Sequence, residues 1–185
     1  MKFIPTEIKG LIILEPSVFK DERGHFLELY NSNEFHENGI DVEFVQDNLS
    51  LSKKGVIRGL HFQEQPYEQG KLVRVAFGSA LDVVLDLRKD SPTFGQTYSL
   101  ILSSENNSML WIPAGFAHGF EALSENVVFV YKVTKYYNQS SEKGIRFNDP
   151  DLNIKWITKD PIVSEKDLIL PSLKEYVNKN ENNIK

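Results

Sequence analysis

The sequence predicts an all-β fold, in which short strands form a sandwich or a small barrel. Segments rich in Val, Ile, Phe, Tyr and Leu recur at intervals of roughly 10–15 residues, which is typical of these architectures. Turn signals such as Lys54-Gly55 and Ser91-Pro92 separate the segments. Helical patterns are scarce along the same stretch, so the strands are expected to make up most of the domain.

The candidate strands are short apolar segments bounded by turns. Alternation is clearest in LDVVLDL at 81–87, where Asp82, Val84 and Asp86 share one strand face and the leucines share the other face with Val83. The other candidates have similar length and composition: 11–14, 26–30, 42–46, 56–62, 72–77, 97–102, 109–112 and 127–134.

Two segments favour short helices. The first is 32–38, with Ser32 as its N-cap and Gly39 just beyond its C-terminus. The second is 164–176, a helical region near the C-terminus that Pro171 interrupts. We predict one domain over residues 1–176, followed by a polar tail, 177–185, that frays.

Composition and charge exclude several classes of function. The chain has 185 residues, 41% apolar and 25% charged, which suits one globular domain. It has no cysteine, which excludes disulfides, thiolate-bound metals and a thiol nucleophile. The net charge of -5 argues against nucleic acid as a partner, and no segment reaches the ~18 apolar residues of a membrane span. Because no secretory signal opens the sequence, we expect a cytoplasmic protein.

The histidines do not form a pattern that predicts a metal site. A metal-binding strand would present ligands as His-x-His, whereas here the segment is His61-Phe62-Gln63. The pattern Pro113-x-Gly115-x-x-His118 resembles the second metal motif of the cupin barrels, but the first motif lacks its paired histidines and acid. We expect no metal and keep a metal-dependent cupin enzyme as an alternative.

Polar groups gather most densely in the apolar segment 55–75. Arg58, His61 and Lys71 are embedded there in strand-like sequence. In a regular strand Arg58 and His61 would face opposite sides, but a bulge at Gly59 would turn both into one cavity. This cluster is therefore the first candidate for the functional site.

Eight segments, in the same order along the chain, resemble the dTDP-4-dehydrorhamnose 3,5-epimerases. The segments are DERGHFLE (21–28), QDNLS (46–50), GVIRGLHFQ (55–63), QGKLVRV (69–75), SPTFG (91–95), LWIPAGFAHGF (110–120), VYKVTKYY (130–137) and SEKD (164–167). The resemblance implies a cupin-type jelly-roll β-barrel that forms a homodimer and uses no metal or organic cofactor. It also implies conversion of dTDP-4-dehydro-6-deoxy-D-glucose to dTDP-4-dehydro-L-rhamnose, a step in dTDP-L-rhamnose and polysaccharide biosynthesis.

The same resemblance implies the catalytic residues. His61 would be the base and Asp167 its dyad partner, since a carboxylate on the far ring nitrogen fixes the tautomer. Lys71 would face the negative charge that develops on the sugar oxygen O4″. Tyr131 would be the acid that returns a proton from the opposite side.

Substrate binding is likewise implied by the resemblance. Arg23 and Arg58 would pair with the diphosphate or the sugar, and Tyr137 would stack on thymine. The full set of implied binding residues is Arg23, Glu28, Gln46, Asn48, Arg58, Lys71, His118, Tyr137, Glu142 and Lys166.

Three other functions stay open beside the double epimerase. A monofunctional 3-epimerase would share the first deprotonation and therefore His61, Lys71 and Asp167. A metal-dependent cupin enzyme would bind a metal through His61 and His118. A non-catalytic sugar-binding module would use the same pocket without turnover.

Overall fold

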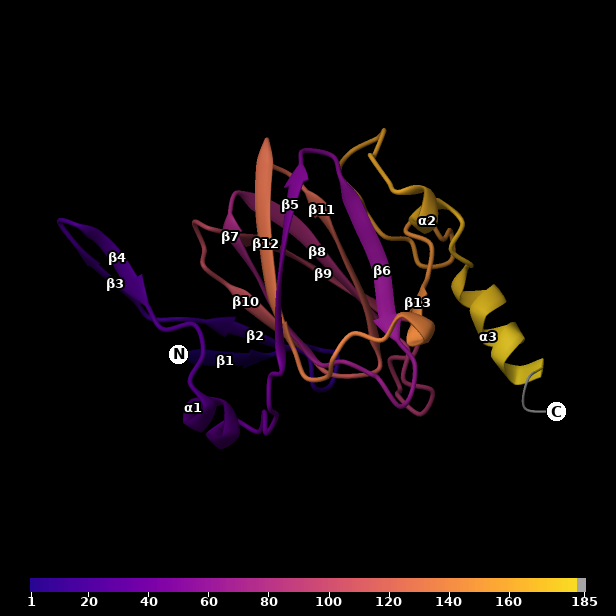
Figure 1. Ribbon diagram of the computed structural model, residues 1–185, viewed down its shortest axis with the longest axis horizontal. Coiled ribbons are helices and arrows are strands. Elements are labelled where there is room, and N and C mark those ends of the chain that lie inside the picture. The colour runs from indigo at the N-terminus through magenta and orange to yellow at the C-terminus, as the bar shows by residue number, and fades with distance from the viewer. Residues whose placement is uncertain (183–185) are drawn as a thin grey trace.

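The computed structural model describes residues 1–182 and confirms the predicted all-β class, because two antiparallel sheets face each other (Figure 1). One sheet contains, in spatial order, β1 (Lys2–Pro5), β2 (Ile12–Glu15), β10 (Met109–Ile112), β7 (Lys71–Phe77), β12 (Asn126–Val133) and β5 (Gln46–Lys53). The other contains β13 (Glu142–Gly144), β6 (Ile57–Gln63), β11 (Phe116–Ala122), β8 (Ser79–Asp86) and β9 (Thr97–Ser103).

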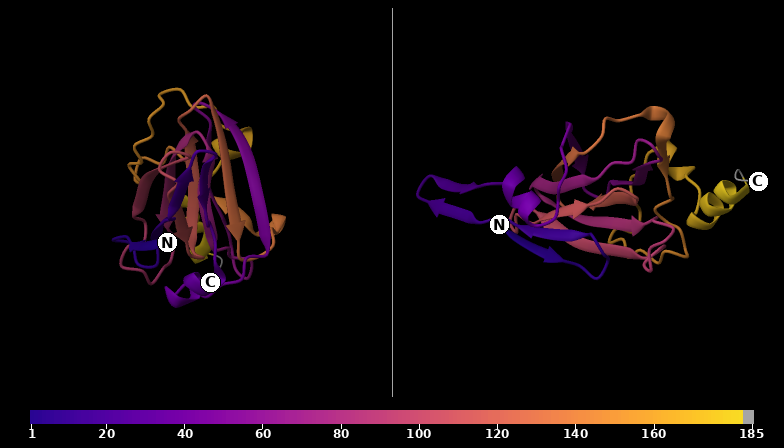
Figure 2. Two further views of the ribbon diagram at one scale, coloured as in Figure 1. Left: turned by 90° about the vertical axis from the view of Figure 1, so that its left-hand side faces the viewer. Right: turned by 90° about the horizontal axis from the view of Figure 1, so that it is seen from below.

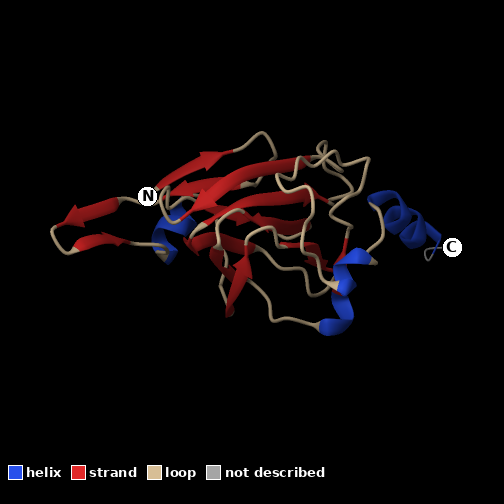
Figure 3. Cartoon of the chain, turned by 90° about the horizontal axis from the view of Figure 1, so that it is seen from above, coloured by secondary structure: helices blue, strands red, loops and turns tan. Residues whose placement is uncertain are grey.

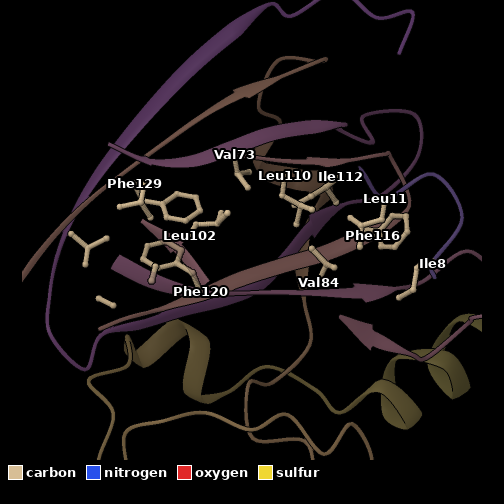
Figure 4. Packing of buried hydrophobic residues seen from close by; sticks show 14 residues of the cluster. Ile8, Leu11, Val73, Val84, Leu102, Leu110, Ile112, Phe116, Phe120 and Phe129 are labelled. Atoms are coloured by element: carbon tan, nitrogen blue, oxygen red, sulfur yellow. The ribbon is translucent and has the colours of Figure 1, made fainter. Parts of the chain in front are cut away.

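The hydrophobic core fills the space between the two sheets. Phe120 of β11 and Phe129 of β12 stack there with ring centroids 4.2 Å apart and nearly parallel planes (Figure 4). Val84 of β8 points into the same cluster, whereas Leu81 and Val83 belong to a second cluster on the outer face. The alternation predicted for 81–87 is therefore confirmed, and the outer cluster is covered by the C-terminal part of the chain.

Strand boundaries differ from the sequence prediction at several places. The predicted strand 42–46 lies mostly before β5, and the predicted strand 26–30 lies mostly after β4 (Gly24–Leu27). The sequence patterns also missed β1, β11, β13 and β3 (Val18–Asp21). The other predicted strands are present within about two residues of their predicted ends.

The helices are short, as predicted. Helix α1 (Ser32–Glu37) begins after Asn31, whose side chain accepts from two backbone amides, so the N-cap is Asn31 and not Ser32. Helices α2 (Glu165–Leu168) and α3 (Leu173–Asn182) flank Pro171, and a 3₁₀ turn, η1, spans Gln139–Ser141. Helix α3 continues through the first part of the tail that we predicted to fray; residues 183–185 of that tail lie outside the described residues.

A two-stranded hairpin, β3–β4, projects from one end of the sandwich, and the C-terminal helices lie at the other end (Figures 1, 2 and 3). Its two strands pair only with each other among the described strands. Phe19 and Phe26 on this hairpin are 64% and 68% exposed. The two rings, whose centroids are 6.5 Å apart, form an exposed apolar patch on the hairpin.

Strands β6 and β11 approach each other very closely at two glycines. Between Arg58 and His61 strand β6 has one residue more than the paired stretch of β11, which is a bulge, and Gly59 has φ +126° there. A Cβ on Gly59 would lie 2.6 Å from the Cα of Gly119, so only glycine fits. The bulge that the sequence predicted is confirmed, and it lets Arg58 and His61 line one cavity.

No helix within residues 1–182 is long and apolar enough to cross a membrane. The longest of them, α3, has ten residues, whereas a span requires about 20.

Candidate active site

A cavity of about 550 Å³ opens between the two sheets beside α2. Side chains from both sheets, from the loop before η1 and from α2 line it together. Nine of the predicted site residues are among them: Arg58, His61, Lys71, His118, Tyr131, Tyr137, Glu142, Lys166 and Asp167. The cavity therefore collects residues that lie more than 100 positions apart in the sequence.

His61 and Asp167 form a hydrogen-bonded pair in this cavity. The distance from His61 Nε2 to Asp167 Oδ1 is 2.7 Å, and the second carboxylate oxygen accepts from the backbone N–H of Gly59 at 3.3 Å. Burial raises the pKa of Asp167, but hydrogen bonds from His61, Gly59 and Ser164 outweigh it and hold this pKa below its usual value. Asp167 is thus ionised and holds His61 through Nε2. The other ring nitrogen, Nδ1, makes no contact with Asp167.

Lys71 reaches from β7 across the interior towards β6. Its Nζ donates to the backbone carbonyl of His61 at 3.2 Å, and the residue is only 8% exposed. Burial lowers the pKa of Lys71 from 10.5 to about 8, although the carboxylates of Asp82 and Glu142 oppose this change. At neutral pH the ammonium group therefore keeps its charge while being poorly solvated.

Tyr131 lies on the wall opposite His61. It belongs to β12 in the six-stranded sheet, whereas His61 belongs to β6 in the five-stranded sheet. Burial raises the pKa of the Tyr131 phenol, so it stays protonated near neutral pH. A molecule in the cavity would thus have an imidazole on one side and a proton-bearing phenol on the other.

The rim carries a chain of hydrogen bonds centred on Glu142. Lys166 Nζ and the Tyr137 hydroxyl both donate to Glu142 Oε2, at 2.6 and 2.7 Å. Burial raises the pKa of Glu142, but these hydrogen bonds outweigh it and hold the pKa below its usual value. These hydrogen bonds join α2, β13 and the loop before η1 around the opening of the cavity.

Gln46 and Asn48 lie beside the cavity and do not line it. The backbone N–H of Tyr137 donates to Gln46 Oε1 at 3.2 Å, and Gln46 Nε2 donates to Asn48 Oδ1 at 2.8 Å. Both residues share a face of β5 with Ser50, which does line the cavity.

The structure does not bring Arg23 and Glu28 to the cavity of their own chain. Arg23 lies at the tip of the projecting hairpin, paired with Asp21, and its side chain is 85% exposed. Glu28 accepts from Asn31 just before α1. Because the hairpin points away from the sandwich, neither residue lines the cavity of its own chain, and their role in substrate binding stays a prediction.

The motifs missed a second buried pair. His118 Nε2 lies 2.7 Å from Asp82 Oδ2, and Asp82 is fully buried. Alternation had placed Asp82 on the face of Val84, which is the interior face. An aspartate on the inward face of an apolar strand was the signal that could have revealed it.

Among residues 1–182 no group of three or more His, Asp or Glu side chains is arranged to hold a metal ion. His61 and His118 face each other across the β6–β11 pair, and each is hydrogen-bonded to its own aspartate.

Comparison with known proteins gives one consistent match. A family profile described as dTDP-4-dehydrorhamnose 3,5-epimerase matches residues 5–175. The dTDP-4-dehydrorhamnose 3,5-epimerase of Salmonella typhimurium LT2 is 54% identical over 175 residues, covering 94% of this chain and 96% of that protein.

Solved structures agree with this match. The dTDP-6-deoxy-D-glucose-3,5-epimerase of Legionella pneumophila, in complex with dTDP-4-keto-L-rhamnose, is 47% identical with a TM-score of 0.90, covering 94% of this chain and 93% of that one. ChmJ, a 3′-monoepimerase of Streptomyces bikiniensis in complex with dTDP-quinovose, is 31% identical with a TM-score of 0.91, covering 96% and 90%. The fold is thus the cupin-type jelly roll that the sequence resemblance implied, and the chain belongs to the dTDP-4-dehydrorhamnose 3,5-epimerase family.

Proposed function

We propose that this chain epimerises dTDP-4-dehydro-6-deoxy-D-glucose at C3″ and C5″ to give dTDP-4-dehydro-L-rhamnose. The observation that carries the proposal is the arrangement of the cavity, with the His61–Asp167 pair on one wall and Tyr131 on the other. The family membership supports the choice of substrate, and its relatives of 47–54% identity bear 3,5-epimerase names.

The chemistry follows from the acidity of hydrogens next to a ketone. His61 removes the proton from C3″ or C5″, and the electron pair of the broken C–H bond moves to O4″, giving an enolate. Lys71 stabilises the charge on that oxygen from a buried position, where an ammonium group acts most strongly. Tyr131 then gives its proton to the same carbon from the opposite face, which inverts the centre.

The other cationic and aromatic groups suit a nucleoside diphosphate. Arg58 and Lys166 would bind phosphate oxygens, and Tyr137 would stack on thymine at the rim. The remaining proposed contacts come from His118 and Glu142 inside the cavity and from Gln46 and Asn48 beside it.

We further propose that the protein acts as a homodimer in which the hairpin of one subunit completes the cavity of the other. The exposed Phe19 and Phe26 on the hairpin, and Leu49 and Leu51 on edge strand β5, more than 60% exposed each, are surfaces that a partner would bury. In such a dimer Arg23 and Glu28 of one chain reach the nucleotide bound by the other. Both residues could then bind substrate, as the family motif implies, although neither lines the cavity of its own chain.

Mixing two impaired variants, assayed at a substrate concentration well below the wild-type KM, tests this arrangement. Arg23→Ala should raise KM by roughly tenfold or more, since a hydrogen bond to a charged group is lost. When Arg23→Ala and His61→Ala chains are co-expressed, mixed dimers should contain one intact site, so about a quarter of the sites are restored. If each Arg23 served its own chain, no mixed dimer would contain an intact site, and no fraction of the sites would show the wild-type KM.

Deuterium incorporation tests the reaction itself. In D₂O the enzyme should label both C3″ and C5″ of the 4-keto sugar, because each carbon exchanges its hydrogen with solvent during inversion; an NMR time course would follow both. Labelling at C3″ alone would show a monofunctional 3-epimerase, and binding without labelling would show a sugar-binding module. Activity that disappears on chelation and returns with iron, zinc or manganese would instead show a metal-dependent enzyme.

A further inference from the structure

Tyr137 lies on the loop before η1, residues 134–138, which connects β12 to that turn. Because the loop belongs to no strand, its backbone groups need partners other than a neighbouring strand. Two glutamine side chains supply such partners. Gln69 Nε2 donates to the carbonyl of Lys135 at 2.7 Å, and Gln46 Oε1 accepts from the N–H of Tyr137 at 3.2 Å. The path of the loop thus depends on side chains that reach it from elsewhere.

A third glutamine, Gln63, holds the same loop from the buried side. It lies two residues after His61 on β6, lines the same cavity and is only 6% exposed. Its Oε1 accepts from the backbone N–H of Asn138 at 2.6 Å, and its Nε2 donates over a longer distance, 3.5 Å, to the carbonyl of Tyr136. One amide group therefore binds the backbone on both sides of Tyr137.

The amide of Gln63 also joins this loop to the loop after β6. Its Nε2 donates to the carbonyl of Tyr67 at 2.8 Å. A buried amide is stable only when its donors and its acceptor are paired, and here the partners are backbone groups of the two loops. Removal of the amide would therefore take away the anchor that the two loops share.

The ring of Tyr137 is held at its other end by Glu142. The Tyr137 hydroxyl donates to Glu142 Oε2 at 2.7 Å, and Glu142 is the register partner of Gln63 in the β6–β13 pair. The backbone end and the hydroxyl end of Tyr137 are thus fixed by two neighbouring residues. Tyr137 is also 52% exposed, so its ring is open to a ligand at the rim. A ring fixed at both ends before binding loses little freedom when a flat base stacks on it.

We infer that Gln63 is a positioning residue that fixes the Tyr137 ring for stacking on the base of the bound nucleotide. The inference rests on the proposed function, in which Tyr137 stacks on thymine. Gln63 takes no part in the proposed proton transfers. Its loss should therefore weaken binding of the nucleoside and leave the chemical step unchanged, which appears as a higher KM at constant kcat.

A double-mutant cycle with Gln63→Met and Tyr137→Ala tests the inference, with isothermal titration of dTDP as the measurement. Gln63→Met keeps the length of the side chain but removes the amide. It should raise the Kd of dTDP and the KM of the nucleotide sugar by roughly five- to tenfold, with kcat within about twofold of the wild type. In the Tyr137→Ala background it should change Kd by less than about twofold, because its effect acts through that ring. Equal effects in both backgrounds would overturn the inference.

Pyrophosphate separates positioning of the ring from a general disturbance of the cavity. It carries no base, so its inhibition constant should be the same for the wild type and Gln63→Met. An equal loss of affinity for pyrophosphate and dTDP would contradict the inference.

Two further variants complete the test. Gln63→Asn keeps an amide that is one methylene too short to reach both loops, so it should also raise the Kd of dTDP and serves if Gln63→Met does not fold. An unchanged Kd in folded Gln63→Asn would contradict the inference. Gln96→Met, at an exposed glutamine just before β9, is the matched control and should change neither Kd nor KM.

The binding measurement needs no turnover, so the two possible failures can be told apart. A wild type that binds dTDP without epimerising the sugar would refute the proposed function. A wild type that binds and turns over, combined with additive effects of Gln63→Met and Tyr137→Ala, would refute only the role of Gln63.

Discussion

Replacing His61 with alanine is expected to lower kcat by about 10²–10⁴-fold, because the reaction loses its general base. The nucleotide sugar should still bind, since the groups proposed to hold it, such as Arg58, Lys166 and Tyr137, stay in place. Single-turnover deuterium exchange at C3″ should fall in parallel with kcat. Isothermal titration with dTDP would check that binding survives.

Two comparisons sharpen this test. Asp167→Asn keeps the size of the anchor but removes the carboxylate at 2.7 Å from Nε2, so it should slow exchange by a smaller but clear factor. His36→Ala, at an exposed histidine of α1 paired with Asp41, should leave the rate unchanged. Undiminished activity in His61→Ala would refute the proposed base.

Lys71→Met should lower kcat by about 10²–10³-fold, since one donor to the enolate oxygen is lost. Methionine has nearly the same length, so the cavity keeps its shape. The free energy of unfolding should not fall, because the variant no longer buries an ammonium group at 8% exposure. Steady-state kinetics and urea unfolding of the same sample would measure both effects.

The contrast between activity and stability is the informative result for Lys71→Met. Lys54→Met, at an exposed lysine in the turn before β6, should change neither quantity. If Lys71→Met reduced activity only in proportion to lost stability, Lys71 would be a structural residue and the assignment would fail.

Strands could be predicted from the sequence wherever their apolar residues face the core. The prediction failed for strands whose polar residues face inward. In β5 the polar residues Gln46, Asn48 and Ser50 face the cavity side, while Leu49 and Leu51 face outward. Hydrophobic alternation cannot detect such a strand without knowledge of the cavity.

Strand β11 was missed for a related reason. All seven of its residues are buried, including His118 and Glu121. His118 is paired with Asp82, and Glu121 accepts from the backbone N–H groups of Ile157 and Thr158. These partners lie 36 or 37 residues away, so no local pattern shows that the polar side chains are satisfied.

Nine of the residues that the family motifs name do line one cavity, but the positions of the others could not be predicted from the motifs. Motif spacing says nothing about the direction in which the β3–β4 hairpin leaves the sandwich, so Arg23 could not be assigned to its own cavity or to that of a partner. Asp82 was visible only as one polar position in an alternating strand, and its pairing with His118 required the structure.

Gly59 is a position at which this site cannot accept a larger residue. The residue provides the bulge that turns Arg58 and His61 into one cavity, and its amide donates to Asp167. A single methyl group at this position would collide with Gly119 and the carbonyl of His118, so the same mutation would disturb the packing of the sheet and the orientation of the base. A substitution at Gly59 would therefore impair both folding and the reaction, so the two requirements constrain the same codon.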